Sequence, residues 1–369
     1  MPLFIKIFFL VCFVFVNSQA FTQSKGTKFI KANHSRLNYT GRIGKSDSCA
    51  AFYWSGRQVS LVVKNVDTFK VLISDTRDNN FFYVIIDGDS STAKKIKISS
   101  KKRCYTLATF EDKLEHEIQL FKITNTDDHI TRLYGFELNK NATLLKAAKK
   151  PKRSIEFFGN SITCGHGVVV PADSADSGAP EYFNNYRTYG AITARYFNAN
   201  YHSTAKSGIG MTVSWFPQIM SEIYNRLNPD DSLSRWNFRQ FIPDIVVVNL
   251  LQNDSWLVNT PEHNEFKIRF GTVKPTDEYI INDYASFIHS VRSKYPCTKI
   301  ICSLGNMDAT KNGSKFMEII EQAVASLGDK RVVTHFFVYK NSSGHPKILE
   351  QEAMAKSLIK FIEKKLIWK

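Results

Sequence analysis

The sequence pattern changes sharply near residue 150, and this change constrains the fold more than any other feature. Before it, residues 27–140 contain short apolar runs rich in β-branched and aromatic residues, separated by turn formers. After it, short apolar runs alternate with longer segments of helical periodicity. The pattern predicts an all-β domain followed by an α/β domain, and 369 residues are enough for two domains.

The N-terminal part predicts a β-sandwich, because no helical period of useful length appears between its strands. Regularly spaced short strands of this kind are typical of a jelly-roll sandwich. A polar, basic linker follows at residues 139–153 and includes the run Lys149-Lys150-Pro151-Lys152-Arg153. The expected strands are 59–63, 69–73, 81–86, 95–98, 118–123 and 133–138.

The C-terminal part predicts a five-stranded parallel sheet covered by helices on both faces. Strands alternating with helices favour this arrangement because each parallel connection needs a crossover segment. The last helix is expected to pack through Leu349, Ala353, Leu358, Phe361 and Ile362. The expected strands are 155–158, 199–205, 245–251, 299–304 and 331–338, and the expected helices are 185–197, 215–227, 278–294, 314–326 and 347–366.

The first twenty residues have the pattern of a signal peptide. Lys6 precedes an apolar run from Ile7 to Val16, and Ser18-Gln19-Ala20 offers small residues for cleavage. The run is too short to span a bilayer, and no later stretch is long enough either. We therefore expect a secreted or periplasmic protein without a membrane span, divided into a signal peptide (1–20), a β-sandwich domain (21–145) and an α/β domain (146–369).

The formal net charge of +15 limits the classes of partner. An exported chain without a nucleic-acid motif is a poor nucleic-acid binder, whereas an anionic polysaccharide or cell surface would suit the charge. A solvated basic surface without a specific partner is the alternative. Five cysteines remain after the leader, an odd number without zinc-site spacing, so buried thiols are expected more than a disulfide framework.

Small and polar residues follow the predicted strands at four places. Ser161 comes just after the strand 155–158, Gly208 follows 199–205, and Asn253 follows 245–251. His345 lies between the last strand and the last helix. Because parallel strands end at the same edge of a sheet, these four residues are predicted to meet there.

Their side chains have the chemistry of acyl transfer. A serine hydroxyl becomes a good nucleophile when a histidine takes its proton, which assigns Ser161 as nucleophile and His345 as base. The tetrahedral intermediate then needs hydrogen-bond donors at its oxyanion. The backbone N–H groups of Ser161 and Gly208 and the side-chain amide of Asn253 are the predicted donors. Taken singly, each residue could equally be a helix cap or turn residue.

This set of residues resembles the SGNH (GDSL-like) hydrolases, which are named for serine, glycine, asparagine and histidine in four sequence blocks. The first block matches Gly159-Asn160-Ser161-Ile162-Thr163, with asparagine where the family usually has aspartate. The other blocks match Gly208, Asn253-Asp254 and His345-Pro346 in the same order. The resemblance implies a flavodoxin-like catalytic domain and a serine esterase.

Among these hydrolases the chain most resembles carbohydrate esterase family 2, whose members also carry an N-terminal jelly roll. That resemblance implies removal of O-acetyl groups from polysaccharide or oligosaccharide through an acetyl-enzyme, without a metal or organic cofactor. The alternatives are an SGNH lipase or thioesterase, and a carbohydrate-binding protein that has lost turnover. Trp256, two residues beyond Asp254, is the candidate substrate-binding residue, whereas Trp215 and Trp236 are expected in the core.

Two positions depart from the family pattern. Ser342 stands where these enzymes usually carry the aspartate that orients the histidine, and Leu251 replaces the glycine of the third block. The sequence therefore leaves the group that orients His345 open, and neither Asp254 nor Asp308 is an evident substitute. The other histidines, including His166, lack metal-ligand spacing and are expected to be structural or exposed.

Overall fold

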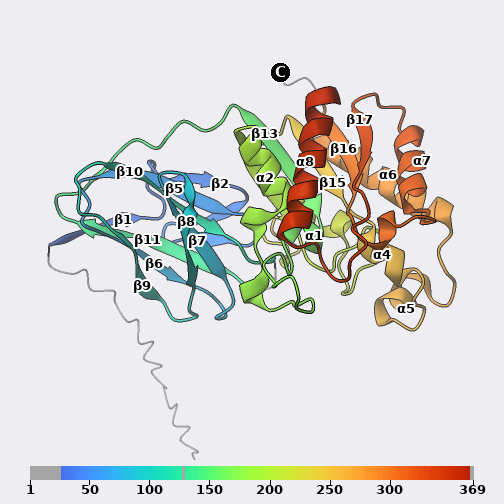
Figure 1. The fold of residues 1–369 in the computed structure, drawn as a ribbon, viewed down its shortest axis with the longest axis horizontal. Helices are drawn as coiled ribbons and strands as arrows, with labels where there is room; N and C mark the ends of the chain where they lie inside the picture. Colours follow the sequence, from blue (N-terminus) through green and yellow to red (C-terminus); the bar gives the residue numbers. More distant parts are fainter. Residues whose placement is uncertain (1–25, 127–128, 366–369) are drawn as a thin grey trace, which may run out of the picture.

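The structure, a computed structural model, describes residues 26–126 and 129–365. An all-β unit and an α/β unit lie side by side, and the linker crosses from one to the other before β13 (Figure 1). The two-part architecture and the type of each part agree with the prediction. The predicted signal peptide, residues 1–20, lies outside the described residues.

The N-terminal unit is a sandwich of two six-stranded antiparallel sheets. One sheet has the order β3-β4-β11-β6-β9 with β1 beside β11, and the other has β12-β5-β10-β7-β8 with β2 beside β5. Alternate residues such as Val59, Leu61 and Val63 point into the shared core, as expected for strands with one buried face. The strands are Thr27–Lys31 (β1), Asn38–Thr40 (β2), Ile43–Lys45 (β3), Ala50–Phe52 (β4), Gln58–Lys64 (β5), Thr68–Ser74 (β6), Phe81–Ile86 (β7), Asp89–Lys97 (β8), Arg103–Thr109 (β9), Glu115–Lys122 (β10), Thr131–Asn139 (β11) and Thr143–Leu144 (β12).

The C-terminal unit is built on a five-stranded parallel sheet with the order β14-β13-β15-β16-β17. The first strand of the unit, β13, therefore lies between the second and the third. At such a point the connections leave toward opposite faces and open a crevice beyond the carboxyl ends of the strands. The strands are Arg153–Gly159 (β13), Ala199–Ala205 (β14), Ile245–Asn249 (β15), Lys299–Leu304 (β16) and Val332–Phe336 (β17).

Helices cover both faces of this sheet. Phe157 points toward α2 and α8 on one face, and Phe158 points toward α6 on the other, because neighbouring residues of a strand face opposite sides. The first of these faces also contacts sandwich residues such as Phe121. The α-helices are Ser161–Cys164 (α1), Tyr189–Tyr196 (α2), Met220–Ile223 (α3), Gln252–Leu257 (α4), Asn264–Phe270 (α5), Asp277–Lys294 (α6), Phe316–Ser326 (α7) and Ile348–Lys365 (α8). Short 3-10 turns are Pro180–Tyr182 (η1), Asn185–Arg187 (η2), Phe238–Gln240 (η3) and Asp308–Thr310 (η4).

The predicted helix 215–227 is wrong except for the single turn α3. Pro217 interrupts the segment, since proline lacks the N–H that a helix interior needs. The preceding loop is held instead by the buried carboxylate of Asp254, which accepts hydrogen bonds from the backbone N–H groups of Met211, Thr212 and Val213 at 2.6–3.0 Å.

The last helix forms as predicted, but its buried face is turned. Leu349 is 78% exposed, and the buried residues are Gln351, Met354, Ala355, Leu358 and Ile362. Gln351 faces inward because its side chain donates to the Ile162 carbonyl and accepts from the Tyr189 N–H, at 3.0 and 2.8 Å. Leu358 and Ile362 are buried as predicted, whereas Leu349 and Ala353 are exposed because the buried stripe includes a satisfied polar residue that an apolar pattern omits.

The state of the cysteines agrees with the prediction only in part. All five cysteines among the described residues are free, but only Cys164 and Cys302 are buried, and Cys297 is exposed. The expectation of free thiols is thus met, whereas the expectation that they are buried holds only for Cys164 and Cys302.

Within the described residues, no helix combines the length and the apolar character needed to cross a membrane.

Candidate active site

Ser161 begins α1 directly after β13 and lies at the carboxyl edge of the sheet. The side chain of Asn160 caps the helix by accepting a hydrogen bond from the Ile162 N–H at 3.1 Å. The first N–H groups of a helix have no partner within it. Within the described residues, no acceptor is bonded to the backbone N–H of Ser161, so this donor is available beside the hydroxyl.

His345 reaches Ser161 from the loop between β17 and α8. Its Nε2 lies 2.8 Å from Ser161 Oγ, although 184 residues separate the two in sequence. Ser161 is 6% exposed and His345 is partly buried, so the contact is largely shielded from solvent. The structure thus brings together the two residues predicted as nucleophile and base.

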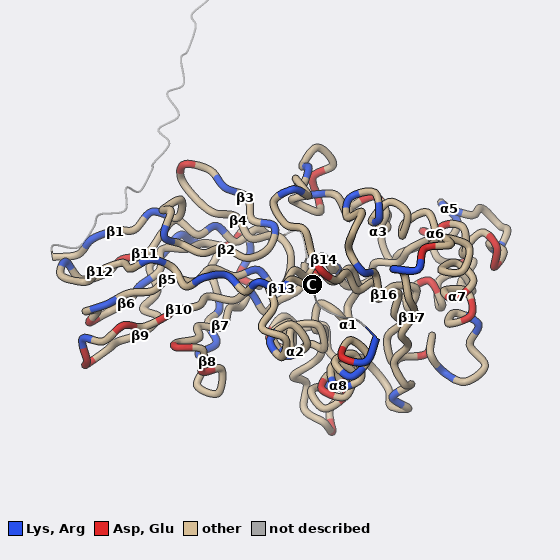
Figure 2. The backbone as a smooth tube through the Cα atoms, turned by 90° about the horizontal axis from the view of Figure 1, so that it is seen from above, with Lys and Arg blue, Asp and Glu red and all other residues tan. Residues whose placement is uncertain are grey.

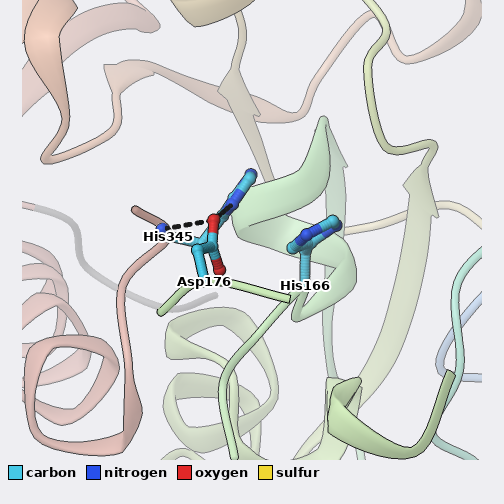
Figure 3. Close-up of side chains that lie close together, drawn as sticks. All are labelled: His166, Asp176 and His345. Atoms are coloured by element: carbon cyan, nitrogen blue, oxygen red, sulfur yellow. Dashed lines mark hydrogen bonds and ion pairs between the residues drawn. The ribbon is translucent and has the colours of Figure 1, made fainter. Parts of the chain in front are cut away.

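Asp176 orients the imidazole from a loop that the sequence reading passed over. Its Oδ2 lies 2.6 Å from His345 Nδ1 and also accepts the His345 backbone N–H at 3.1 Å (Figure 3). A carboxylate can only accept, so Nδ1 carries the proton and Nε2 is left to accept from the serine hydroxyl. The hydrogen bond and the charge of His345 lower the pKa of Asp176 to about 2, which keeps it ionised at neutral pH.

The two loops that carry Asp176 and His345 are fastened to each other. Lys347 Nζ donates to the carbonyls of Pro171, Ala172 and Ser174 at 2.6–3.1 Å, two residues after the histidine. Gly344 has φ of 70°, and a Cβ there would lie 2.8 Å from Asp176 Cβ. Only a residue without a side chain therefore allows the loops to approach this closely.

Ser342, at the usual place of the family's aspartate, has a different role. Its hydroxyl donates to Glu350, and its backbone carbonyl accepts from Lys340 Nζ at 2.8 Å. These contacts fold the loop before His345 and do not reach the imidazole. No sequence block signals Asp176; the only hint is that it lies in a polar, aspartate-bearing loop, residues 171–178, soon after the serine block.

His166 lies against the imidazole of His345, which the sequence reading did not foresee. The two rings are stacked with centroids 4.0 Å apart and planes 27° from parallel, and Phe183 packs on the other ring edge of His166. Burial, followed by the nearby charge of His345, lowers the pKa of His166 to about 4. At neutral pH His166 is therefore uncharged, and its ring forms one side of the site.

The side chains of His166, Asp176 and His345 are also close enough together to hold a metal ion, with ligand atoms within 4.8 Å of one another. The contacts described above, however, use Nδ1 of His345 on a carboxylate and Nε2 on a hydroxyl. Both nitrogens of His345 are thus already engaged in a chain of hydrogen bonds suited to moving a proton.

Gly208 and Asn253 follow the carboxyl ends of β14 and β15, the two strands that flank β13. Gly208 has φ of 79°, and no acceptor among the described residues is bonded to its N–H. Asn253 donates through Nδ2 to the Ile209 carbonyl at 2.7 Å, which uses one of its two donors. The carboxylate of Asp254 holds the intervening loop, as described above, so both blocks share one support.

Leu251 has φ of 78°, a left-handed conformation that costs a non-glycine residue about 1–3 kcal/mol. The glycine usual in this block is therefore explained by backbone geometry. Leu251 is fully buried in the core beside the sheet, which offsets the strain.

Of the two tryptophans near the site, Trp215 is not in the core as predicted, and the substrate contact of Trp256 stays a prediction. Trp215, expected in the core, is 46% exposed and donates from Nε1 to Asn253 Oδ1 at 3.0 Å. Trp256, the predicted substrate contact, is partly buried, packs against the core and donates to Asp308 at 3.0 Å. Trp236 is buried as predicted. An exposed indole bonded to Asn253 is the better placed of these rings for contact with a substrate.

Comparison with known proteins supports the same family. Residues 39–147 match the family model "Carbohydrate esterase 2 N-terminal". The chain is 29% identical to the cellulase/esterase CelE of Acetivibrio thermocellus over 89% of this chain and 39% of that protein. It is 26% identical to an acetylxylan esterase / glucomannan deacetylase of Cellvibrio japonicus over 69% of this chain and 71% of that one.

A solved structure covers almost the same extent. A family two carbohydrate esterase from Clostridium thermocellum, in complex with cellohexaose, superposes with a TM-score of 0.77 at 29% identity. The alignment covers 89% of this chain and 99% of that chain. The similarity thus extends over both the N-terminal sandwich and the unit built on the parallel sheet. In sequence and fold the chain is thus similar to family 2 carbohydrate esterases and to SGNH (GDSL-like) hydrolases.

Proposed function

We propose that this protein is a serine esterase that removes O-acetyl groups from polysaccharide or oligosaccharide. The observation that carries the proposal is the continuous chain of hydrogen bonds from Ser161 Oγ to His345 Nε2 at 2.8 Å and from His345 Nδ1 to Asp176 Oδ2 at 2.6 Å. The sugar substrate rests on the family relationship, since relatives are acetylxylan esterases and one binds cellohexaose. Secretion, expected from the N-terminal sequence, is part of the same proposal.

The first step forms an acetyl-enzyme. Nε2 of His345 accepts the Ser161 proton while Oγ attacks the acetyl carbonyl carbon, and Asp176 stabilises the imidazolium that results. The oxyanion accepts hydrogen bonds from the N–H groups of Ser161 and Gly208 and from the remaining donor of Asn253. His345 then returns the proton to the sugar oxygen, which leaves as an alcohol.

The second step releases acetate. A water molecule gives a proton to His345 Nε2 and attacks the acetyl carbon, and the same donors hold the second oxyanion. The proton passes from His345 to Ser161 Oγ as the ester bond breaks. Each residue thus serves in both steps.

The exposed ring of Trp215 would hold the sugar beside the acetyl group. Its donor bond to Asn253 places the indole next to the proposed oxyanion site. Aromatic rings present an apolar face of the size of a pyranose while keeping a polar edge in contact with protein or water. We assign this residue, together with Trp256, to substrate binding.

Acetate release from acetylated xylan, acetylated glucomannan and an acetylated algal polysaccharide tests the proposal. Wild-type protein should release acetate from at least one of them, and Ser161→Ala should release none above background. Faster hydrolysis of long-chain acyl esters or thioesters than of any acetylated sugar would instead favour the lipase or thioesterase reading. Binding to the sugars without release by wild type would favour a binding protein.

A further inference from the structure

We propose that a basic groove between the two domains binds an anionic saccharide at a site separate from the serine. The groove is defined by Lys45, Lys149, Lys150, Lys152 and Arg153. It comprises a cavity of about 620 Å³ between the domains and a second of about 390 Å³ along the linker, and both are lined by Lys150 and Lys152. The larger volume is in the range of cavities that bind small molecules.

The charge of the groove is positive throughout. Neither cavity has an aspartate or glutamate in its lining. The carboxylate of Asp244 is bonded to Ser154, which lines the larger cavity, but that carboxylate already accepts the Ser154 N–H and O–H at 2.8 and 2.9 Å. Partial burial, and then the charge of Lys45, lower the pKa of Lys150. An anion between these two ammonium groups would relieve their mutual repulsion.

The groove is held in shape by contacts between the linker and the sandwich. Lys150 Nζ donates to the Tyr39 carbonyl at 3.0 Å, and Lys45 Nζ lies 5.0 Å from the centre of the Tyr39 ring. Both ammonium groups are thus positioned around one tyrosine. Their side chains differ in this respect from lysines that extend freely into water.

His202 lines the larger cavity, and further positive charge lies behind it. His202 Nε2 accepts the Gly41 N–H at 3.1 Å, so the proton of the neutral ring is on Nδ1, which has no partner among the described residues. Behind it lie the buried guanidinium groups of Arg42 and Arg57; Arg42 pairs with the buried carboxylate of Glu156 at 3.0 Å. Burial, and then the charges of Arg57, Arg42 and Lys150, lower the pKa of His202.

The groove lies at the end of the sheet opposite the proposed catalytic residues. Lys152, Arg153 and Ser154 are at the start of β13, whereas Ser161 follows its end. A strand of this length spans roughly 20 Å. Figure 2 shows lysine and arginine segments along the chain that leads into β13, between the two domains. A ligand in the groove would therefore not occupy the site of ester hydrolysis.

The lining favours a sugar that carries a carboxylate or a sulfate. Asn200 and Gln240 supply amide groups that can bond sugar hydroxyls, and Trp236 and Phe241 supply apolar ring surface. Ammonium groups from the linker would bind the anionic substituent. This combination of amides, rings and cations suits a charged polysaccharide better than a lipid surface, which would contact an open face and not a cavity.

Binding to three polymers tests the inference: polygalacturonate for carboxylate, dextran sulfate for sulfate, and dextran as the uncharged control. Affinity gel electrophoresis should show binding to one or both charged polymers and none to dextran, and rising salt should weaken it. The combined variant Lys45→Gln, Lys150→Gln and Lys152→Gln should lower affinity by roughly tenfold. Which polymer binds decides between the two anionic groups.

A matched control separates the groove from net charge. Lys311→Gln, Lys330→Gln and Lys360→Gln removes the same charge at exposed positions outside the groove and should change affinity less than about twofold. Equal weakening in both triple variants would overturn the site. So would tighter binding to double-stranded DNA or to anionic phospholipid vesicles than to either charged polysaccharide.

Two further measurements keep this result independent of the esterase proposal. Ser161→Ala should bind the charged polymer as well as wild type, because the serine lies at the other end of the sheet. The groove variant should release acetate from a neutral acetylated sugar at the wild-type rate. Binding that disappears in Ser161→Ala would place the anion in the catalytic site and contradict the groove.

Discussion

Asp176 and His345 lie 169 residues apart in sequence, yet the carboxylate of the first accepts both the ring N–H and the backbone N–H of the second. The usual position for the orienting acid, three residues before the histidine, holds Ser342. The protein thus supplies the carboxylate from a different loop. In the proposed mechanism this carboxylate serves as the third catalytic group, from another part of the chain.

Replacing Asp176 by asparagine should lower kcat by roughly 10²–10⁴-fold while leaving KM nearly unchanged. The amide cannot stabilise the imidazolium and can favour the wrong tautomer. Initial rates of acetate release measure the effect. Ser342→Ala is the matched control and should retain activity within about threefold, since its contacts are to Lys340 and Glu350. A larger loss in the serine variant than in the aspartate variant would reverse the assignment.

His166→Ala should lower kcat by roughly tenfold, because His345 would lose the ring stacked 4.0 Å from its own and gain rotational freedom. His166→Phe restores a flat, uncharged ring and should recover most of the rate. Comparing kcat of the two variants distinguishes packing from chemistry. If phenylalanine is as damaging as alanine, His166 acts through its nitrogen atoms and not as a wall.

Substitutions at Trp215 should separate substrate binding from support of Asn253. Trp215→Ala is expected to raise KM for an acetylated oligosaccharide by about tenfold, through loss of the ring. Trp215→Phe keeps a ring but loses the donor to Asn253 Oδ1, so kcat should fall more than KM rises. Steady-state kinetics on the oligosaccharide and on a small acetate ester measure both effects. Equal KM for wild type and Trp215→Ala on the oligosaccharide would exclude a sugar contact.

Folding stability should decrease as pH falls from about 6.5 to about 4. Burial lowers the pKa of His166 and His335 to about 4, so the unfolded chain takes up protons in this range and the folded chain does not. Each such histidine contributes a slope of up to about 1.4 kcal/mol per pH unit. His166→Phe should lower the number of protons taken up on unfolding by about one, and so lower the slope by up to about 1.4 kcal/mol per pH unit. Urea denaturation at constant ionic strength measures it, and an unchanged slope in this variant would contradict the burial of a neutral ring.

The sequence was sufficient to predict the two-part architecture, because alternation of apolar residues and the order of strands and helices are local properties. Strands 199–205 and 299–304 agree with the structure residue for residue. The short strands β1 to β4 and β12 went unpredicted, and so did the seven-residue β9, whose partly polar sequence joins the sheet through backbone pairing with β6.

The candidate site was predictable where function followed from position along the sheet edge. Ser161, Gly208 and Asn253 follow consecutive strands, so topology brings them together. Asp176 and His166 lie in loops, and their place depends on contacts between loops, such as those of Lys347 with the chain before Asp176. Such contacts leave no periodic signal in a sequence. The exposure of Trp215 likewise follows from a loop held by the distant Asp254.

Trapping the covalent intermediate tests the central claim most directly. Wild-type protein mixed with an acetylated substrate, quenched in acid during turnover and digested, should yield an acetylated peptide containing Ser161, and Ser161→Ala should yield none. Acetate release that persists in Ser161→Ala, or an acetyl group found on a different residue, would contradict the account.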